Sequence, residues 1–232
     1  MTSLRVVLEL SFVLSSLLFF IYIDTKKLFK NDRIINSALI HSIISGIGTN
    51  IGLFLYPNMI YDFNGTIQDM HFMFTLLPLI SFGYSFCDLY VGFKSKKLEN
   101  IVHGLVFSLS CAGAYKYGVI MSGYLIMQTE TSSIFLNLRP LKQKWIDLSF
   151  ITTFFIFRLI LCPYLIFMYT LNPENGGKFI ISGGSFIITS LNAYWFYYIV
   201  KKAIRMHNEE KENERKKPIE DAVSINTSSN ER

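Results

Sequence analysis

The sequence predicts an all-α membrane protein, a polytopic bundle of about seven transmembrane helices. Of its 232 residues, 51% are hydrophobic and 17% are charged, and the mean hydropathy is +0.35. An ordinary soluble domain carries roughly 25% charged residues. The apolar residues also gather in runs of about 20, the length that a helix needs to cross the hydrocarbon core of a bilayer.

Short polar segments divide the chain into the predicted spans. The first run has Arg5 ahead of it and ends without a small-residue cleavage site, so we expect a retained span rather than a signal peptide. The fourth and fifth runs are separated only near residues 115–118. The spans cover residues 4–23, 34–56, 71–93, 100–116, 118–136, 148–171 and 178–200.

Basic residues set the expected orientation. They cluster at residues 26–33, 94–97, 139–144 and from 201 onward, and the alternate loops hold few. With the predicted spans all these clusters fall on one side, which the positive-inside rule makes cytosolic. We therefore expect a lumenal N-terminus and a cytosolic C-terminus. The sequon at Asn64 falls in a predicted lumenal loop, although such tripeptides are common by chance.

Three parts follow from this pattern. Residues 1–33 hold the first span and a cytosolic loop, and residues 34–202 hold the main membrane domain. Residues 203–232 mix Glu, Lys, Asn and Ser with few apolar side chains, so we expect a disordered cytosolic tail.

Several classes of site have no support in the sequence. The basic residues lie between apolar runs rather than in one patch, which argues against nucleic-acid binding. Cys87, Cys111 and Cys162 are odd in number and lack metal-like spacing, so we expect neither a disulfide framework nor a metal site. The chain has no glycine-rich phosphate loop, and we expect no cofactor.

Asp88 and His103 are ionisable residues inside apolar runs, where such groups are costly and indicate a functional site. Each lies six residues inside the basic end of its span. At 1.5 Å per residue, both therefore lie about 9 Å deep on consecutive antiparallel helices. We expect a charge-assisted hydrogen bond between them.

His41, Glu130 and Arg158 fall in the same half of the bilayer as Asp88 and His103. These five residues, here called the polar layer, are predicted to lie roughly 9–17 Å deep and to form a chamber open to the cytosol. Two plainer interpretations stay open. Glu130 and Arg158 would form an ion pair that only orders the bundle, and His41 would only hydrogen-bond a neighbouring carbonyl.

Motifs in a fixed order cover residues 34–202. They are Asn36, His41-Ser42, Gly83-Tyr84 with Asp88, Ile101-Val102-His103, the segment from Glu130 to Arg139, Phe157-Arg158, Pro163-Tyr164, Leu191-Asn192 and Trp195-Phe196. In their order and spacing these motifs resemble the TLC domain of ceramide synthases, translocating-chain-associating membrane proteins and other lipid-related proteins, and most of all TLC-domain proteins outside the ceramide synthases proper.

The resemblance implies that six of the spans form a TLC-like core and that the protein resides in the endoplasmic reticulum. It implies catalytic roles for His103 and Asp88. It also implies a lipid chamber lined by His41, Glu130, Asn137, Arg158 and Trp195.

Departures from the ceramide synthases leave the function open. Those enzymes carry adjacent histidines where this chain has His103-Gly104, and a downstream His-Asp pair and a further Asp that residues 111–128 do not contain. Ile134 also replaces a proline. The first hypothesis is a lipid-handling protein that influences membrane lipid composition. The second is an N-acyltransferase that joins acyl-CoA to a sphingoid base, and the third is a membrane chaperone or translocation factor. Membrane lipids and acyl-CoA are the expected partners, and a homodimer stays open.

Overall fold

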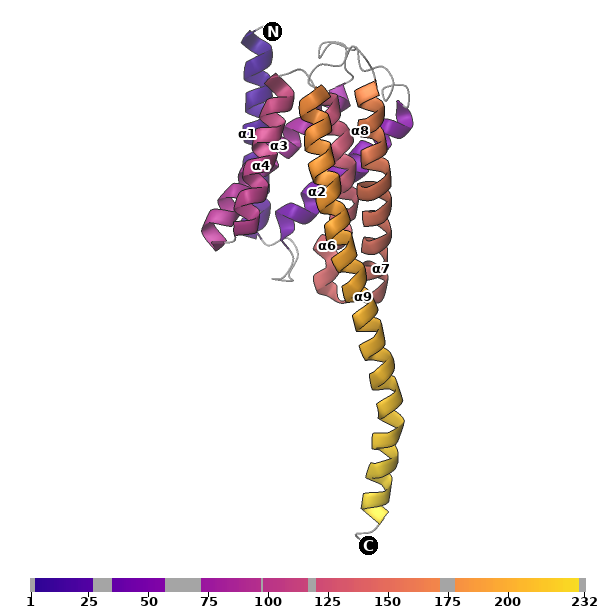
Figure 1. The fold of residues 1–232 in the computed structure, drawn as a ribbon. Helices are drawn as coiled ribbons and strands as arrows, with labels where there is room; N and C mark the ends of the chain where they lie inside the picture. Colours follow the sequence, from indigo (N-terminus) through magenta and orange to yellow (C-terminus); the bar gives the residue numbers. More distant parts are fainter. Residues whose placement is uncertain are drawn as a thin grey trace. The chain divides into compact units, whose positions relative to one another are not determined.

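The computed structural model describes residues 3–26, 35–56, 72–96, 98–116, 120–171 and 178–229. Within these ranges every regular element is helical, which confirms the predicted fold class (Figure 1). The chain forms two compact units, Met1–Ser190 and Leu191–Arg232. The elements are α1 (Ser3–Lys26), α2 (Asn36–Leu55), α3 (Phe72–Ser95), α4 (Leu98–Lys116), α5 (Ile120–Ile126), η2 (Met127–Thr129), α6 (Glu130–Leu138), η3 (Arg139–Leu141), α7 (Lys144–Thr153), η4 (Phe154–Leu161), α8 (Cys162–Leu171) and α9 (Lys178–Ser229).

Each predicted span contains helix, and the structure supports an integral membrane protein. Among the residues that the structure describes, four helical stretches are long and apolar enough to cross a membrane, and a shorter apolar helix covers Asn100–Gly113. The fifth predicted span is not one continuous α-helix, because the 3₁₀ turn η2 separates α5 from α6. The four long stretches are Val6–Lys26, Asn36–Leu55, Thr75–Ser95 and Lys144–Leu171.

Glycines set the spacing of α1, α3 and α4, which lie side by side in Figure 1. A Cβ atom at Gly83 of α3 would lie 2.6 Å from the Val13 carbonyl oxygen of α1. A Cβ atom at Gly104 of α4 would lie 2.8 Å from the Ser85 carbonyl oxygen of α3. Only residues without a side chain allow backbones to come this close, as in other membrane helix pairs.

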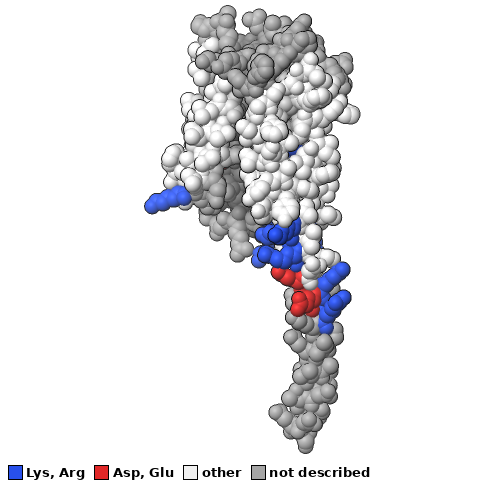
Figure 2. All heavy atoms as spheres, in the orientation of Figure 1, with Lys and Arg blue, Asp and Glu red and all other residues white. Residues whose placement is uncertain are grey.

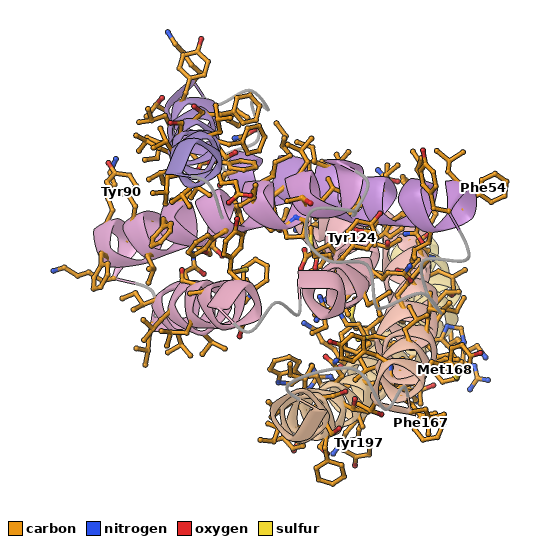
Figure 3. The ribbon with its side chains drawn as sticks, turned by 90° about the horizontal axis from the view of Figure 1, so that it is seen from above. Phe54, Tyr90, Tyr124, Phe167, Met168 and Tyr197 are labelled. Atoms are coloured by element: carbon orange, nitrogen blue, oxygen red, sulfur yellow. The ribbon has the colours of Figure 1, made fainter. Side chains whose placement is uncertain are left out.

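The core of the first unit combines apolar side chains with buried polar ones such as His41, Ser45 and Ser81, whereas its outer surface is largely apolar. Figure 3 shows Tyr124 pointing in among the helices, and its side chain is fully buried. Phe54, Tyr90 and Phe167 point away from the helices, and Phe54 is 85% exposed. In water such a surface would associate, whereas in a bilayer it contacts lipid chains.

Two contacts show which helix ends lie together. Asp24 near the end of α1 accepts hydrogen bonds from the Ser37 backbone nitrogen at 2.8 Å and hydroxyl at 2.6 Å, at the start of α2. Asn137 near the end of α6 donates to the Ser42 hydroxyl at 3.4 Å. The start of α2 is therefore close to the ends of both α1 and α6.

Most of the described basic residues of the first unit lie at this same end. α3 runs parallel to α1, since Gly83 contacts Val13 while Cys87 packs with Phe20, and both helices finish here. Figure 2 shows almost no charge on the visible face of the helices away from this end. The described basic residues at this end, here called the basic end, are Lys26, Lys94, Lys96, Arg139, Lys142 and Lys144.

The expected disorder of residues 203–232 differs from the structure, in which α9 continues as a helix to Ser229. The segment is rich in Lys, Glu and Arg, which are good helix formers. Oppositely charged side chains one turn apart add support, and Arg205 lies 3.6 Å from Glu209. Helix propensity and such pairs account for the helical backbone of this segment.

Candidate functional site

Asp88 and His103 form the hydrogen bond that the sequence predicts. The His103 Nδ1 atom lies 2.7 Å from the Asp88 Oδ2 atom. The Asp88 side chain is only 9% exposed, whereas that of His103 is 58% exposed. The carboxylate holds the proton on Nδ1, and Nε2 makes no hydrogen bond with any described residue. The imidazole is therefore oriented by a buried acceptor and presents Nε2 to its surroundings.

The pair is held by two tightly packed helices rather than by loops. Besides the close approach at Gly104, the Ser85 and Ser108 hydroxyls are 2.7 Å apart across the same interface. Hydrogen bonds and small residues are the usual means of joining helices in a membrane. They fix the distance between α3 and α4, and with it the geometry of Asp88 and His103.

The same packing explains why residue 104 is not a second histidine. A Cβ atom there would lie 2.8 Å from both the Leu89 nitrogen and the Ser85 oxygen. These are backbone atoms, so they cannot move aside as a flexible side chain would. Adjacent histidines at 103 and 104 would require α3 and α4 to separate, which would pull His103 away from Asp88.

His41 is buried, with 2% exposure, in contrast to His103. Its Nε2 atom lies 2.9 Å from the Ser81 hydroxyl and 3.0 Å from the Ser45 hydroxyl. Its ring stacks on Tyr84 at a centroid distance of 3.9 Å. The sequence left open a neighbouring carbonyl as the partner of His41; in the structure its Nε2 atom has serine hydroxyls of α2 and α3 as partners.

Aromatic side chains connect the two histidines. The Tyr84 phenol, stacked on His41, lies beside the Asp88 carboxylate. Phe107 of α4 lies 5.9 Å from the His103 ring and 6.3 Å from the His41 ring, between centroids. The Asp88–His103 pair and His41 therefore belong to one packed layer, as the sequence predicts.

Glu130 and Arg158 do not form the ion pair that the sequence left open. Arg158 donates from Nε to the Ser132 hydroxyl at 2.7 Å and from Nη2 to the Ser133 hydroxyl at 2.9 Å. Glu130 instead lies with Oε2 at 4.0 Å from His41 Nδ1. Glu130 still acts on Arg158 through charge at longer range, without a direct contact.

Arg158 stands in a π-helix, η4, which the sequence reasoning missed. Cys162, the residue that ends this segment, donates its backbone N–H to the Phe157 carbonyl five residues earlier. Pro163 gives a physical reason, because in an α-helix its ring would clash with the carbonyl of Leu159. A wider turn relieves that clash, and such turns often occur at functional sites.

The remaining predicted site residues are not members of the polar layer. Asn137 joins α6 to α2 through Ser42. Trp195 is 49% exposed and belongs to the Leu191–Arg232 unit, whereas the polar layer lies in the first unit. Asn64 lies outside the described residues. Within the described part of the chain, no three His, Cys, Asp or Glu side chains could hold a metal.

Comparisons with known proteins agree with the sequence motifs. A family model described as the TLC domain matches residues 35–201, nearly the range over which the motifs occur. No curated protein and no solved structure matches the chain. The matched range includes all five residues of the polar layer.

Proposed function

Because the chain belongs to the TLC domain family and has membrane-spanning helices, we propose that it binds a lipid at the Asp88–His103 pair and influences membrane lipid composition. The observation that carries this proposal is the His103 imidazole, 58% exposed on an apolar helix yet hydrogen-bonded to an almost buried carboxylate. Burying Asp88 beside an exposed imidazole is costly in a membrane, which favours a functional over a purely structural role.

The surroundings of His103 suit an amphiphile. On the same helix Val102 is 50%, Leu105 50% and Val106 56% exposed, which offers apolar surface for an alkyl chain. The Nε2 atom offers one hydrogen-bonding position for a head group, and the layer beyond it contains His41 and Glu130. A lipid whose head group hydrogen-bonds to His103 would leave its chain among apolar side chains.

An acyl-CoA-dependent N-acyltransferase is the second candidate. His103 with Asp88 behind it has the arrangement of a general base, which such a reaction needs to take a proton from the amine. Against it stands Gly104, because the helix spacing excludes the second histidine of ceramide synthases. Loss of one catalytic hydrogen-bond donor costs on the order of 10²–10³ in rate in other enzymes. Lipid binding is therefore the better supported function.

We also propose that the basic end faces the cytosol, with the protein in the endoplasmic reticulum. Six described basic residues of the first unit share the basic end, the arrangement that the positive-inside rule associates with the cytosol, whereas Arg5 and Lys116 stand at the other ends of α1 and α4. A cysteine introduced at exposed Lys142 should then react with a membrane-impermeant maleimide from the cytosolic side, and one at Asp62 only after permeabilisation. The opposite labelling pattern would overturn the orientation.

Lipid binding is tested on the full chain purified in detergent. Mass spectrometry should find co-purified lipid in the wild type and a loss of most of it in Asp88→Asn and His103→Gln. The matched control is Asp147→Asn, which removes another carboxylate with a 2.7 Å partner, Arg139, away from the polar layer. Lipid content unchanged in both test variants would refute the proposal.

The enzyme alternative is decided in the same preparation. Long-chain acyl-CoA and sphinganine are added, and the amide product is measured. Product that disappears in His103→Gln and persists in Asp147→Asn would make the protein an acyltransferase. The third hypothesis is a membrane chaperone or translocation factor that acts through the charged part of α9. Its activity would be unchanged in both variants and would be lost on truncation after Arg205.

A further inference from the structure

Arg158 has more hydrogen-bond donors than the described residues satisfy. A guanidinium carries five N–H groups. Nε donates to Ser132 and Nη2 to Ser133, and Nη1 makes no hydrogen bond with a described residue. Nη1 is also not among the fully enclosed polar atoms of the described residues, so it remains accessible.

Ser133 adds a further donor at the same place. The Ser132 hydroxyl already donates to the Thr129 carbonyl at 2.8 Å, so it can only accept from Arg158. The Ser133 hydroxyl accepts from Arg158 Nη2, and its own proton has no acceptor among the described residues. Ser133 is 9% exposed, so bulk solvent is a poor substitute. Arg158 Nη1 and the Ser133 hydroxyl are therefore neighbouring hydrogen-bond donors for which the described residues provide no acceptor.

The positive charge of Arg158 also lacks a direct counterion. No carboxylate of the described residues lies within 4.0 Å of it, and Glu130 acts on it only through charge at longer range. Arg139, which also lies over a phenylalanine ring, differs from Arg158 in having a carboxylate partner. Arg139 and Arg158 each lie 5.2 Å from a phenylalanine ring, but Arg139 has Asp147 at 2.7 Å. A guanidinium at membrane depth without such a partner is costly.

A buried acceptor lies next to these donors in the sequence. Gln128 is 2% exposed, and its Oε1 atom has no hydrogen-bond partner among the described residues. It precedes Ser132 by one helical turn, and η2, which carries it, packs against η4, which carries Arg158. Orphaned buried polar atoms usually indicate a missing partner. The helical turns around Arg158 therefore contain polar groups that the described residues leave without a partner.

We propose that Arg158 and Ser133 form an oxyanion-binding subsite for the phosphate or carboxylate head of a membrane amphiphile. The subsite rests on the proposed lipid-binding function and names its ligand class. The planar guanidinium matches two oxygens of such a head group, which an ammonium does not. Ser132 and Ser133 lie five or six residues before the end of α6, about 8–9 Å from the basic end. That is the depth of Asp88 and His103.

The test compares two lipids that differ by one phosphate. Purified full-length protein in detergent is titrated with 1-oleoyl lysophosphatidate or with monoolein, and binding is followed by native mass spectrometry. We expect lysophosphatidate to bind about 10–100-fold more tightly, the effect of hydrogen bonds to a charged group. Arg158→Gln should abolish that preference, and Ser133→Ala should reduce it by about threefold to tenfold. Arg139→Gln, the matched control, should keep it.

Several outcomes would overturn the subsite. Equal binding of both lipids by the wild type would remove the subsite and leave lipid binding at Asp88–His103 intact. Inorganic phosphate that displaces lysophosphatidate at equal concentration would assign the site to a soluble anion. If Arg158→Gln elutes as an aggregate, Arg158→Lys and Ser133→Ala are measured instead. An undiminished preference for lysophosphatidate over monoolein in both variants would contradict the subsite. Binding of neither lipid by the wild type would count against the proposed function itself.

Discussion

His41 and His103 are two histidines of the same polar layer that the structure places in opposite environments. His41 is 2% exposed, stacked on Tyr84 and hydrogen-bonded to two serines. The His103 side chain is 58% exposed and hydrogen-bonded to one carboxylate. Nε2 of the first makes both hydrogen bonds inside the protein, with the Glu130 carboxylate 4.0 Å from Nδ1, whereas the second presents Nε2 on an exposed ring. Depth in the bilayer alone does not separate a structural histidine from a functional one.

The strongest way to break this comparison is to remove each ring in turn. His41→Ala leaves a cavity against Tyr84 and two serine hydroxyls without their partner, so it should lower the free energy of unfolding by about 2–4 kcal/mol. His103→Gln keeps a donor for Asp88 on a half-open surface and should cost less than about 1 kcal/mol. Both are measured by denaturation in detergent. Equal destabilisation by the two variants would mean that His103 is structural as well.

The sequence predicted much of this site, and the reasons for its failures are physical. The bond between Asp88 and His103 followed from their spacing on either side of a short turn, because consecutive antiparallel helices bring equal depths together. The hydrogen-bond partners of Arg158 could not be predicted from its depth in the same way. Opposite charges at similar depth suggested Glu130, but the π-helix of η4 sets the direction of the arginine side chain, and the nearby serines take the bonds.

The close backbone contact at Gly104 could not be predicted from the sequence either. Gly104 reads as a missing histidine when it is aligned with ceramide synthase motifs, and the structure shows a contact with the backbone of α3. That contact depends on the rotation of two helices about their axes. Apolar runs that are exposed on several sides fix such rotations poorly, because a membrane helix has no polar face toward water.

An effect of intermediate size is expected when the spacing of α3 and α4 is changed. Gly104→Ala places a Cβ atom 2.8 Å from two backbone atoms, so the helices must shift at a cost of about 1–3 kcal/mol. The control is Gly113→Ala on the same helix, where nothing lies within 4 Å. There the substitution should be neutral or stabilising by up to about 1 kcal/mol. Lipid binding at His103 should fall in the first variant alone.

Similar stability of the two alanine variants would show that α4 is free to move away from α3. The close approach would then not be what positions His103 against Asp88. In that case the contrast between the histidines would rest on exposure alone, and a second histidine at 104 would become acceptable to the fold.

The smallest expected effect concerns the hydroxyl pair across the same interface. Ser85 and Ser108 are 2.7 Å apart, and the coupling between such groups in membrane proteins averages about 0.6 kcal/mol. A double-mutant cycle with Ser85→Ala and Ser108→Ala should therefore give a coupling near that value and little loss of bound lipid. A coupling several times larger would shift the main restraint on His103 from the glycine contact to this hydrogen bond. The exposed histidine would then be held by a polar link, as the buried one is.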